Sequence, residues 1–470
     1  MPIYSSKFYT QLIEPSWRLI VLELSLYSDS IIFNKQIEYE EDEVYQMEDE
    51  NHNYIRGYES DEEEEKYGIE GLILELVDFS IDLLKRKNVM EGLKGVLLTF
   101  LLCIKGYTLL PNQSLALWKD DPNLYITEEF DDENINSVRS KTLNLIKEIT
   151  KEIDDDSILK FLKIILSEFT EGLKIENYSD VIKLDDYNFM TPYFEKMNNS
   201  NEYIFRRHEA NLLILGTLAE DLIILREKNR ITKSEVEELI KFLFSIISNP
   251  TKENSILVGR AIWCVSRLLS LIKHDTEILN AVFEGISLSL CHHNSDLSVR
   301  LVSCLCLTQV CSKINSTDYY HPNIEIIYPK LIQLLQEVSE ETILIPIECI
   351  SALSQINKEK ALYVPYQASK LIVEIYSKFY NHPSIGVKIL ELIKLWCTDN
   401  RSAKVLISLF VPFAIFVFDD FFKSLGKVDK NFEEIKKTVI TEHGNANMSV
   451  KTNLDMLPVR FKICYFFPSF

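Results

Sequence analysis

Few side chains in this sequence are arranged in patterns that could do chemistry. Cys291, His292 and His293, together with Cys304 and Cys306, offer the thiol and imidazole groups that zinc prefers. The group contains no C-x-x-C pair, and its members fall on alternating faces of predicted helices, so packing explains them better than metal binding. We therefore expect no metal site.

Paired carboxylates are the other candidate for chemistry, because general acid–base catalysis often uses two of them. Asp131-Asp132 and the run Asp154 to Asp156 are such groups, but both lie in polar turns, where solvated charges and helix caps are the usual explanation. The sequence contains no Walker A, G-x-G-x-x-G, G-x-S-x-G or H-E-x-x-H pattern. We expect no enzymatic activity and no cofactor.

An acidic segment at residues 38–66 is the most unusual part of the sequence. It contains 14 carboxylates between positions 38 and 65, against the single basic residue Arg56, and so holds most of the net charge of −21. Self-repulsion should keep it unfolded. It is either a loop that aids solubility or a polyanionic arm that attracts basic ligands. The second interpretation predicts basic-protein binding by Glu40, Glu41, Asp42, Glu43, Asp61, Glu62, Glu63, Glu64 and Glu65.

The net charge, the cysteines and the first residues indicate which partners and which compartment to expect. A net charge of −21 and a pI near 5.0 disfavour direct binding of DNA, RNA or anionic lipid. Cysteines inside apolar stretches and the lack of a basic, then apolar, leader indicate the cytoplasm and nucleus. The longest apolar run, 405–418, is interrupted by Ser408 and Pro412, so we expect no membrane span.

Hydrophobic periodicity predicts an all-α fold. Apolar residues recur at steps of three and four in many segments, and Gly (13) and Pro (14) are scarce. Pro15-Ser16 is expected to begin the first helix, Thr232 to Glu235 resembles a capping box, and Asp296 to Ser298 precedes another helix. Representative stripes are Ile69, Leu72, Leu76, Phe79 and Leu83; Leu279, Val282, Ile286 and Leu290; and Ile385, Ile389, Leu392 and Trp396.

The helices are also predicted to repeat. Charged residues near the starts of apolar helices are Arg139, Glu209, Arg260, Arg300, Glu348 and Lys388. The last four are separated by 40, 48 and 40 residues, close to the period of about 40 to 47 in HEAT and armadillo repeats. In the pattern Asp296-x-x-Val299-Arg300, the arginine could bond to the neighbouring repeat. The alternative is an ordinary helical bundle with chance spacing.

These observations predict four regions along the chain. Residues 1–37 form a first helical segment, 38–66 the acidic loop, 67–440 a helical-repeat superhelix (solenoid), and 441–470 an irregular tail. The gap of 70 residues between positions 139 and 209 is explained by a polar insertion near 176–202. A solenoid would present an extended wall that suits protein binding.

Four blocks of sequence resemble the importin-β-type (karyopherin-β) nuclear transport receptors, most closely the importin nine group. They are Trp118-x-x-Asp121-Pro122-x-x-Tyr125-Ile126-x-x-Glu129 with Ser137-Val138-Arg139; Arg207-His208-Glu209-Ala210 leading to Leu215-Gly216-Thr217-Leu218-Ala219; Leu257 to Arg267; and Asp296 to Arg300. The resemblance covers roughly residues 15 to 425.

This resemblance implies a HEAT-repeat superhelix that shuttles between cytoplasm and nucleus. Such receptors carry basic cargo, for example histones and ribosomal proteins, contact nucleoporins, and release cargo when the GTP form of the small GTPase Ran binds. Family members are longer, and their main Ran-binding surface lies in N-terminal repeats. Only about 35 residues precede the acidic segment here, so we expect those repeats to be missing and Ran to bind weakly. The resemblance is to the central part of such a receptor, so the chain is expected to be a receptor or a fragment of one. The alternatives are another receptor of this type, such as the importin seven and eight group, and a HEAT scaffold that assembles a protein complex without transport.

Overall fold

The computed structural model is entirely helical over the residues that it describes. These are 3–33, 68–86, 97–130, 137–171, 201–248, 250–272, 275–292, 295–314, 323–356, 364–379, 382–397, and residues 403, 404 and 406. No strand occurs within these ranges, so the all-α prediction is confirmed there. The acidic segment, the tail at 441–470 and the insertion near 176–202 lie outside them, except for Asn201 and Glu202, which begin a helix.

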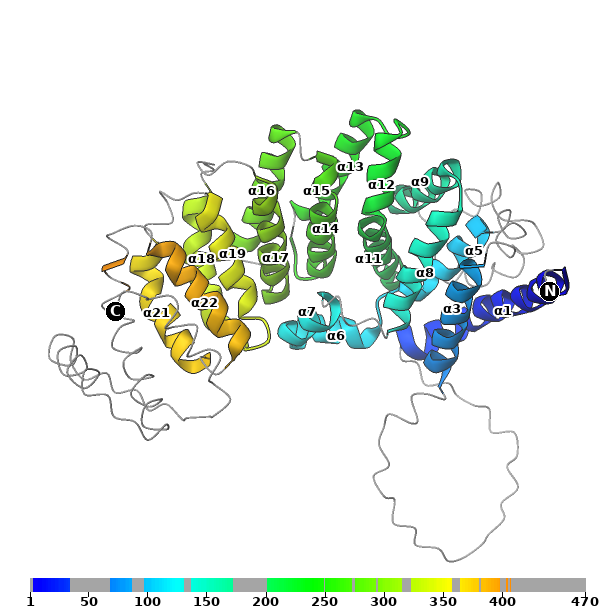
Figure 1. Cartoon of the computed structure of the whole chain (residues 1–470), viewed down its shortest axis with the longest axis horizontal. Helices are drawn as coiled ribbons and strands as arrows, with labels where there is room; N and C mark the ends of the chain where they lie inside the picture. Colours follow the sequence, from blue (N-terminus) through cyan, green and yellow to red (C-terminus); the bar gives the residue numbers. More distant parts are fainter. Residues whose placement is uncertain are drawn as a thin grey trace, which may run out of the picture. The chain divides into compact units, whose positions relative to one another are not determined.

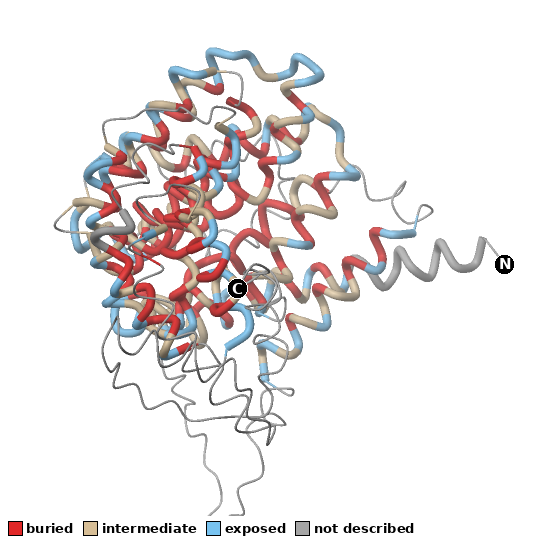
Figure 2. Tube along the Cα trace, turned by 60° about the vertical axis from the view of Figure 1, so that its left-hand side comes forward, coloured by how far each residue is buried: buried red, intermediate tan, exposed pale blue. Residues whose placement is uncertain are grey.

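The chain divides into two compact units. Unit 1 comprises Met1–Ile246 and Ile256–Leu271, and unit 2 comprises Ile247–Ser255 and Ile272–Phe470. Each unit has its own buried apolar core. In Figure 2, buried residues (red) alternate along the helices with intermediate and exposed ones, as expected where each helix turns one face inward.

Unit 1 is built around a long, nearly enclosed helix, α11, in which 11 of 17 residues are buried. Helices α1, α3 and α8 pack in succession, and α8, α9 and α12 contact α11 (Figure 1). The helical elements are α1 (Ile3–Tyr27), the π-helix η1 (Ser28–Ile32), α3 (Ile69–Leu84), α5 (Leu97–Ile104), the 3-10 helix η2 (Lys105–Thr108), α6 (Asn112–Asp120), α7 (Pro122–Phe130), α8 (Val138–Glu152), α9 (Asp155–Glu171), α11 (Asn201–Thr217), α12 (Ala219–Glu227), α13 (Lys233–Ile247), α14 (Ser255–Arg267) and α15 (Leu269–Ile272).

Unit 2 is a stack of helix pairs. The first helix of each pair packs against the first helix of the following pair, which gives the series α16–α18–α21. The second helices pack in the same way and give the series α17–α19–α22. This alternation is what a helical repeat produces, because each pair buries its apolar faces against its neighbours. The helices are α16 (Thr276–Cys291), α17 (Leu297–Lys313), α18 (Ile324–Glu337), α19 (Leu344–Ile356), α21 (Val364–Phe379) and α22 (Pro383–Trp396).

The predicted helix starts are partly confirmed. Thr232 and Glu235 form a reciprocal capping box: the Thr232 backbone N–H donates to the Glu235 carboxylate at 2.8 Å, and the Glu235 N–H donates to the Thr232 hydroxyl at 3.2 Å. Helix α17 begins at Leu297, directly after Asp296, as expected. The start at Pro15 is wrong, because α1 begins at Ile3 and Pro15 lies inside it. Proline favours a first turn but is tolerated in a helix interior at a cost.

The predicted core stripes hold where a helix is clearly amphipathic. All four stripe residues of α16 and all four of α22 are buried. In α3 the predicted stripe is wrong except at Leu83, which is buried. Leu72 is 42% exposed, and the buried face runs through Ile73, Val77, Ile81 and Leu84. Helix α3 carries apolar residues on several of its own faces, so hydrophobic periodicity alone could not identify the buried face.

None of the helices in the described ranges has both the length and the low charge content of a membrane-crossing segment.

Candidate functional site

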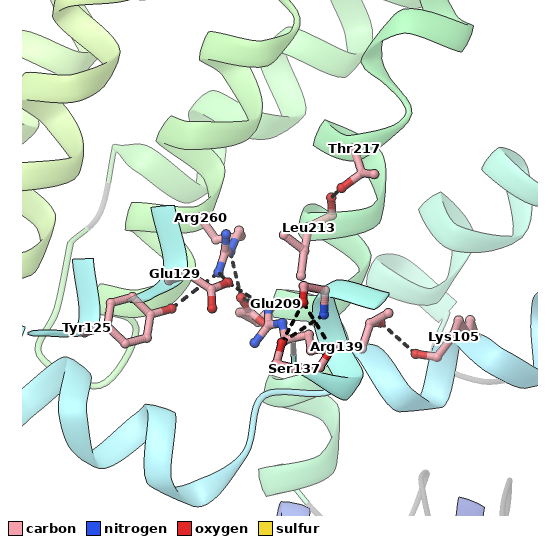
Figure 3. A network of polar contacts seen from close by, with 11 residues as sticks. Lys105, Tyr125, Glu129, Ser137, Arg139, Glu209, Leu213, Thr217 and Arg260 are labelled. Carbon is pink, nitrogen blue, oxygen red and sulfur yellow. Dashed lines mark hydrogen bonds and ion pairs between the residues drawn. The ribbon is translucent and has the colours of Figure 1, made fainter. Parts of the chain in front are cut away.

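A buried cluster of ion pairs in unit 1 is centred on Glu209 of α11. The Glu209 side chain has no exposed surface, and Nη2 of Arg139 in α8 donates to its two oxygens at 2.6 and 2.7 Å. Nε of Arg260 in α14 donates to Oε1 at 2.7 Å (Figure 3). Three of the charged residues that the sequence places near helix starts are therefore in direct contact.

Helix α7 adds a second carboxylate to this cluster. Nη2 of Arg260 donates to Glu129 and, at 3.3 Å, to the hydroxyl of Tyr125. Oε1 of Glu129 lies 3.7 Å from Nη2 of Arg139. Two guanidinium groups are thus balanced by two carboxylates, which is how a protein tolerates charges removed from water.

The electrostatics of the cluster keep Glu129, Arg139 and Arg260 ionised. Burial alone would raise the pKa of Glu129, but the neighbouring Arg139 and Arg260 hold it below the ordinary value of 4.5. Burial acts to lower the pKa of Arg260, yet Glu209 and Glu129 raise it well above its usual range. Because these charges are paired with one another, the cluster is suited to joining helices and poorly suited to proton transfer.

Two tryptophan rings pack beside the ion pairs, each in close contact with a glycine on another helix. A Cβ atom added at Gly259 would lie 2.5 Å from the Trp118 ring, and one added at Gly216 would lie 2.3 Å from the Trp263 ring. The Trp118 ring meets Tyr125 edge-on, with centroids 5.1 Å apart. Both helices thus need glycine for the rings to approach closely.

The pair Cys264 and Trp263 in α14 offers no obvious chemistry. Cys264 is fully buried, and burial raises the pKa of its thiol well above the usual range, which disfavours the nucleophilic thiolate. The guanidinium of Arg260 lies 5.2 Å from the Trp263 ring centroid, a cation–π contact that holds the ring in place.

A second buried ion pair lies on the other side of α11. Nζ of Lys105 donates to the Glu168 carboxylate, and Nδ2 of Asn211 donates to the other Glu168 oxygen at 2.8 Å. Nε of Arg207 lies 3.7 Å from the same carboxylate. Burial lowers the pKa of Lys105, and Glu168 only partly opposes this change. This pair binds η2 and α9 to α11.

Arg206, the residue before Arg207, points in a third direction and has no exposed surface. Its Nη1 donates to the Leu110 carbonyl and, at 3.3 Å, to that of Ile32 at the end of η1. Its guanidinium also lies over the Phe33 ring, 4.8 Å from the centroid. Arg206 therefore ties the end of η1 and Phe33 to the backbone at Leu110.

In unit 2 the repeat-equivalent positions also form ion pairs with adjacent helices. Nη2 of Arg300 in α17 donates to Glu337 of α18 at 2.5 Å, which confirms the predicted contact between neighbouring pairs. Nζ of Lys388 in α22 lies 3.3 Å from Glu348 of α19. Both pairs are partly exposed, so each contributes little to stability.

The predicted basic-protein site from Glu40 to Glu65 lies outside the described residues, so that prediction stays untested. Within the described ranges, no group of three or more His, Cys, Asp or Glu side chains is arranged to hold a metal ion. Cys304 and Cys306, considered above as zinc ligands, are buried in the α17 core.

Sequence reasoning named Arg139, Glu209 and Arg260 but missed Lys105, Glu168 and Arg206. A signal for the missed residues was available in part: Arg206 and Arg207 stand just before the apolar run Leu212 to Leu215 of the same helix, which a core would enclose. Charges enclosed in that way need partners. Their partners come from distant segments and carry no local pattern.

Comparison with known proteins adds no family. No protein-family model matches the chain. One similar solved structure is the crystal structure of an engineered protein from the Northeast Structural Genomics Consortium. It is 9% identical, with a TM-score of 0.38 over 80% of this chain and 96% of the other. A likeness this small carries no argument about fold or function.

Proposed function

We propose that this chain is a HEAT/armadillo-type repeat superhelix that acts as a nuclear import receptor of the importin-β type and holds basic proteins such as histones and ribosomal proteins. The proposal includes shuttling between cytoplasm and nucleus, contact with nucleoporins and cargo release by the GTP form of Ran. It assigns no enzymatic activity.

One observation carries the proposal. The blocks that resemble import receptors are far apart in the sequence, yet Glu129, Arg139, Glu209 and Arg260 meet in one buried cluster. Chance matches to a family pattern would have no reason to converge, whereas matches that reflect a shared repeat architecture would. Stacked helix pairs in unit 2 support the same architecture.

Charge supports the kind of cargo. The chain carries a net charge of −21, and the segment 38–66 concentrates carboxylates that could attract lysine- and arginine-rich proteins over a Debye length of about 8–10 Å.

The test is direct binding of core histones by the full chain, with and without Ran loaded with a non-hydrolysable GTP analogue. An import receptor should bind histones more tightly than it binds an acidic protein of similar size, and Ran should release them. Absence of histone binding would reject the basic-cargo assignment.

A HEAT scaffold without transport activity is the second candidate. The residues that carry the resemblance are buried, and this favours the scaffold. Buried residues determine how the helices pack, but they do not determine which protein binds. Histone binding that is indifferent to Ran, with an enzyme subunit captured from cell extract, would favour this scaffold.

A further inference from the structure

The helical hairpin α6–α7 is lightly attached to unit 1. Of its side chains only Trp118, Tyr125 and Ile126 are buried, although each helix is 9 residues long. Its other ties to unit 1 are mostly polar: Glu129 and the Tyr125 hydroxyl accept from Arg260, and Asn112 donates to the Phe33 carbonyl and accepts from Arg206. The Phe130 ring also contacts Trp263, with centroids 6.5 Å apart. Elements with few buried apolar side chains open locally at low free energy.

The buried residues that this hairpin covers carry charge and unsatisfied donors. Arg139 and Arg260 face the hairpin, and without Glu129 they would share the single carboxylate of Glu209, leaving a net positive charge. Nε and Nη1 of Arg139 are buried, and no acceptor for them lies within the part of the chain that the structure describes. The bare Cα of Gly259 leaves a notch that the Trp118 ring fills.

Helix α7 shows which ligand pattern this surface accepts. Tyr125 and Glu129 are four residues apart and so lie on one face of the helix, where both accept from Nη2 of Arg260. Leu124, on another face of the same helix, is 41% exposed. A helix with an aromatic hydroxyl and a carboxylate at this spacing can satisfy the arginine.

We propose that α6–α7 occupies a helix-binding groove on unit 1, formed by Arg139, Glu209, Gly259 and Arg260, and that an acidic amphipathic helix of a partner protein with an aromatic residue four positions before a carboxylate takes its place. The charge complementarity of the uncovered groove and the pattern of its internal occupant identify this partner chemistry. None of the residues of the groove belongs to the acidic segment, and the groove would bind a partner of opposite charge to the proposed cargo.

Competition with the internal hairpin sets the expected affinity. A tethered occupant acts at an effective concentration in the millimolar range, so an added helix binds weakly until the hairpin is loosened. Trp118→Ala loosens it while keeping Arg139 and Arg260 intact. The probe is a labelled synthetic peptide copying residues 121–130, and the protein is the full chain.

We expect the peptide to bind Trp118→Ala at least tenfold more tightly than the unchanged chain. Adding Arg260→Met to Trp118→Ala should reduce that binding at least tenfold, and so should a peptide with glutamine in place of the Glu129 equivalent. A 1:1 complex supports the proposal. Equal binding by both chains, indifference to Arg260, or a dimer that exchanges hairpins and ignores the peptide would overturn it.

Hydrogen exchange on the unchanged chain provides a test that needs no variant. Backbone amides in the second half of α7 should exchange at least tenfold faster than those in the middle of α11. Excess peptide from residues 121–130 should leave the protection of α11 unchanged. If α7 is protected as strongly as α11, the hairpin is a permanent part of the core and the proposal fails.

Discussion

Replacing Glu209 by glutamine should destabilise unit 1 strongly. Glu209 has no exposed surface and accepts three hydrogen bonds of 2.6–2.7 Å from Arg139 and Arg260. The amide keeps the shape but removes the charge, so two buried guanidinium groups would share Glu129 alone. Removing one partner from a buried ion pair costs about 3–5 kcal/mol, and we expect a loss of that size.

The assay must report on unit 1 alone, because the chain has two compact units. Of the four tryptophans, Trp396 lies in unit 2 and the other three lie in unit 1. In a Trp396→Phe background, urea unfolding followed by tryptophan fluorescence therefore reports unit 1. Glu220→Gln is the matched control, since that side chain is 71% exposed, and we expect a change below about 1 kcal/mol.

A double variant tests whether charge is the cause. Arg139→Met combined with Glu209→Gln restores the balance between Arg260 and Glu129, so the double loss should be smaller than the sum of the single losses by about 1–3 kcal/mol. Additive losses, or a Glu209→Gln cost below about 1 kcal/mol, would refute the electrostatic reasoning.

Three further predictions concern Gly259, Glu129 and the acidic segment. Gly259→Ala should cost about 1–3 kcal/mol in urea unfolding, because the new Cβ meets the Trp118 ring at 2.5 Å, and less in a Trp118→Leu background. The depressed pKa of Glu129 means that its stabilising contribution is present above pH 4.5 and is lost as pH falls through the lower folded-state value; Glu129→Gln should flatten that acid dependence in pH titrations. Deleting residues 38–65 should slow histone association and flatten its salt dependence in stopped-flow measurements, while thermal stability stays unchanged; unaltered kinetics would make the segment a solubilising loop only.

The sequence identified the central residues of the cluster but not their contacts. Arg139, Glu209 and Arg260 were named as charged residues near the starts of apolar helices, and the structure brings them together. The repeat argument did anticipate the bond from Arg300 to the next helix pair. Periodic placement is a property of the sequence, so it can be recognised from the order of the residues alone.

Contacts between segments without a common period could not be predicted. Lys105 and Glu168 are separated by 63 residues and follow no repeat. Trp263 lies between the buried Ile262 and Cys264 but is itself half-buried, and its ring reaches across to Gly216. A side chain as large as tryptophan can leave its own stripe when a glycine on another helix makes room.

The burial of the cluster also limits what the family resemblance can decide. Arg139, Glu209 and Arg260 are enclosed and engaged with one another, so substitutions there change the stability of unit 1 before they change any partner contact. A variant at these positions that loses histone binding would therefore say nothing about the histone site unless its unfolding free energy were also measured. Changes confined to residues 38–65 do not carry that ambiguity, since the segment is too poor in apolar residues to belong to a core. Partner recognition is therefore best tested first in the acidic segment.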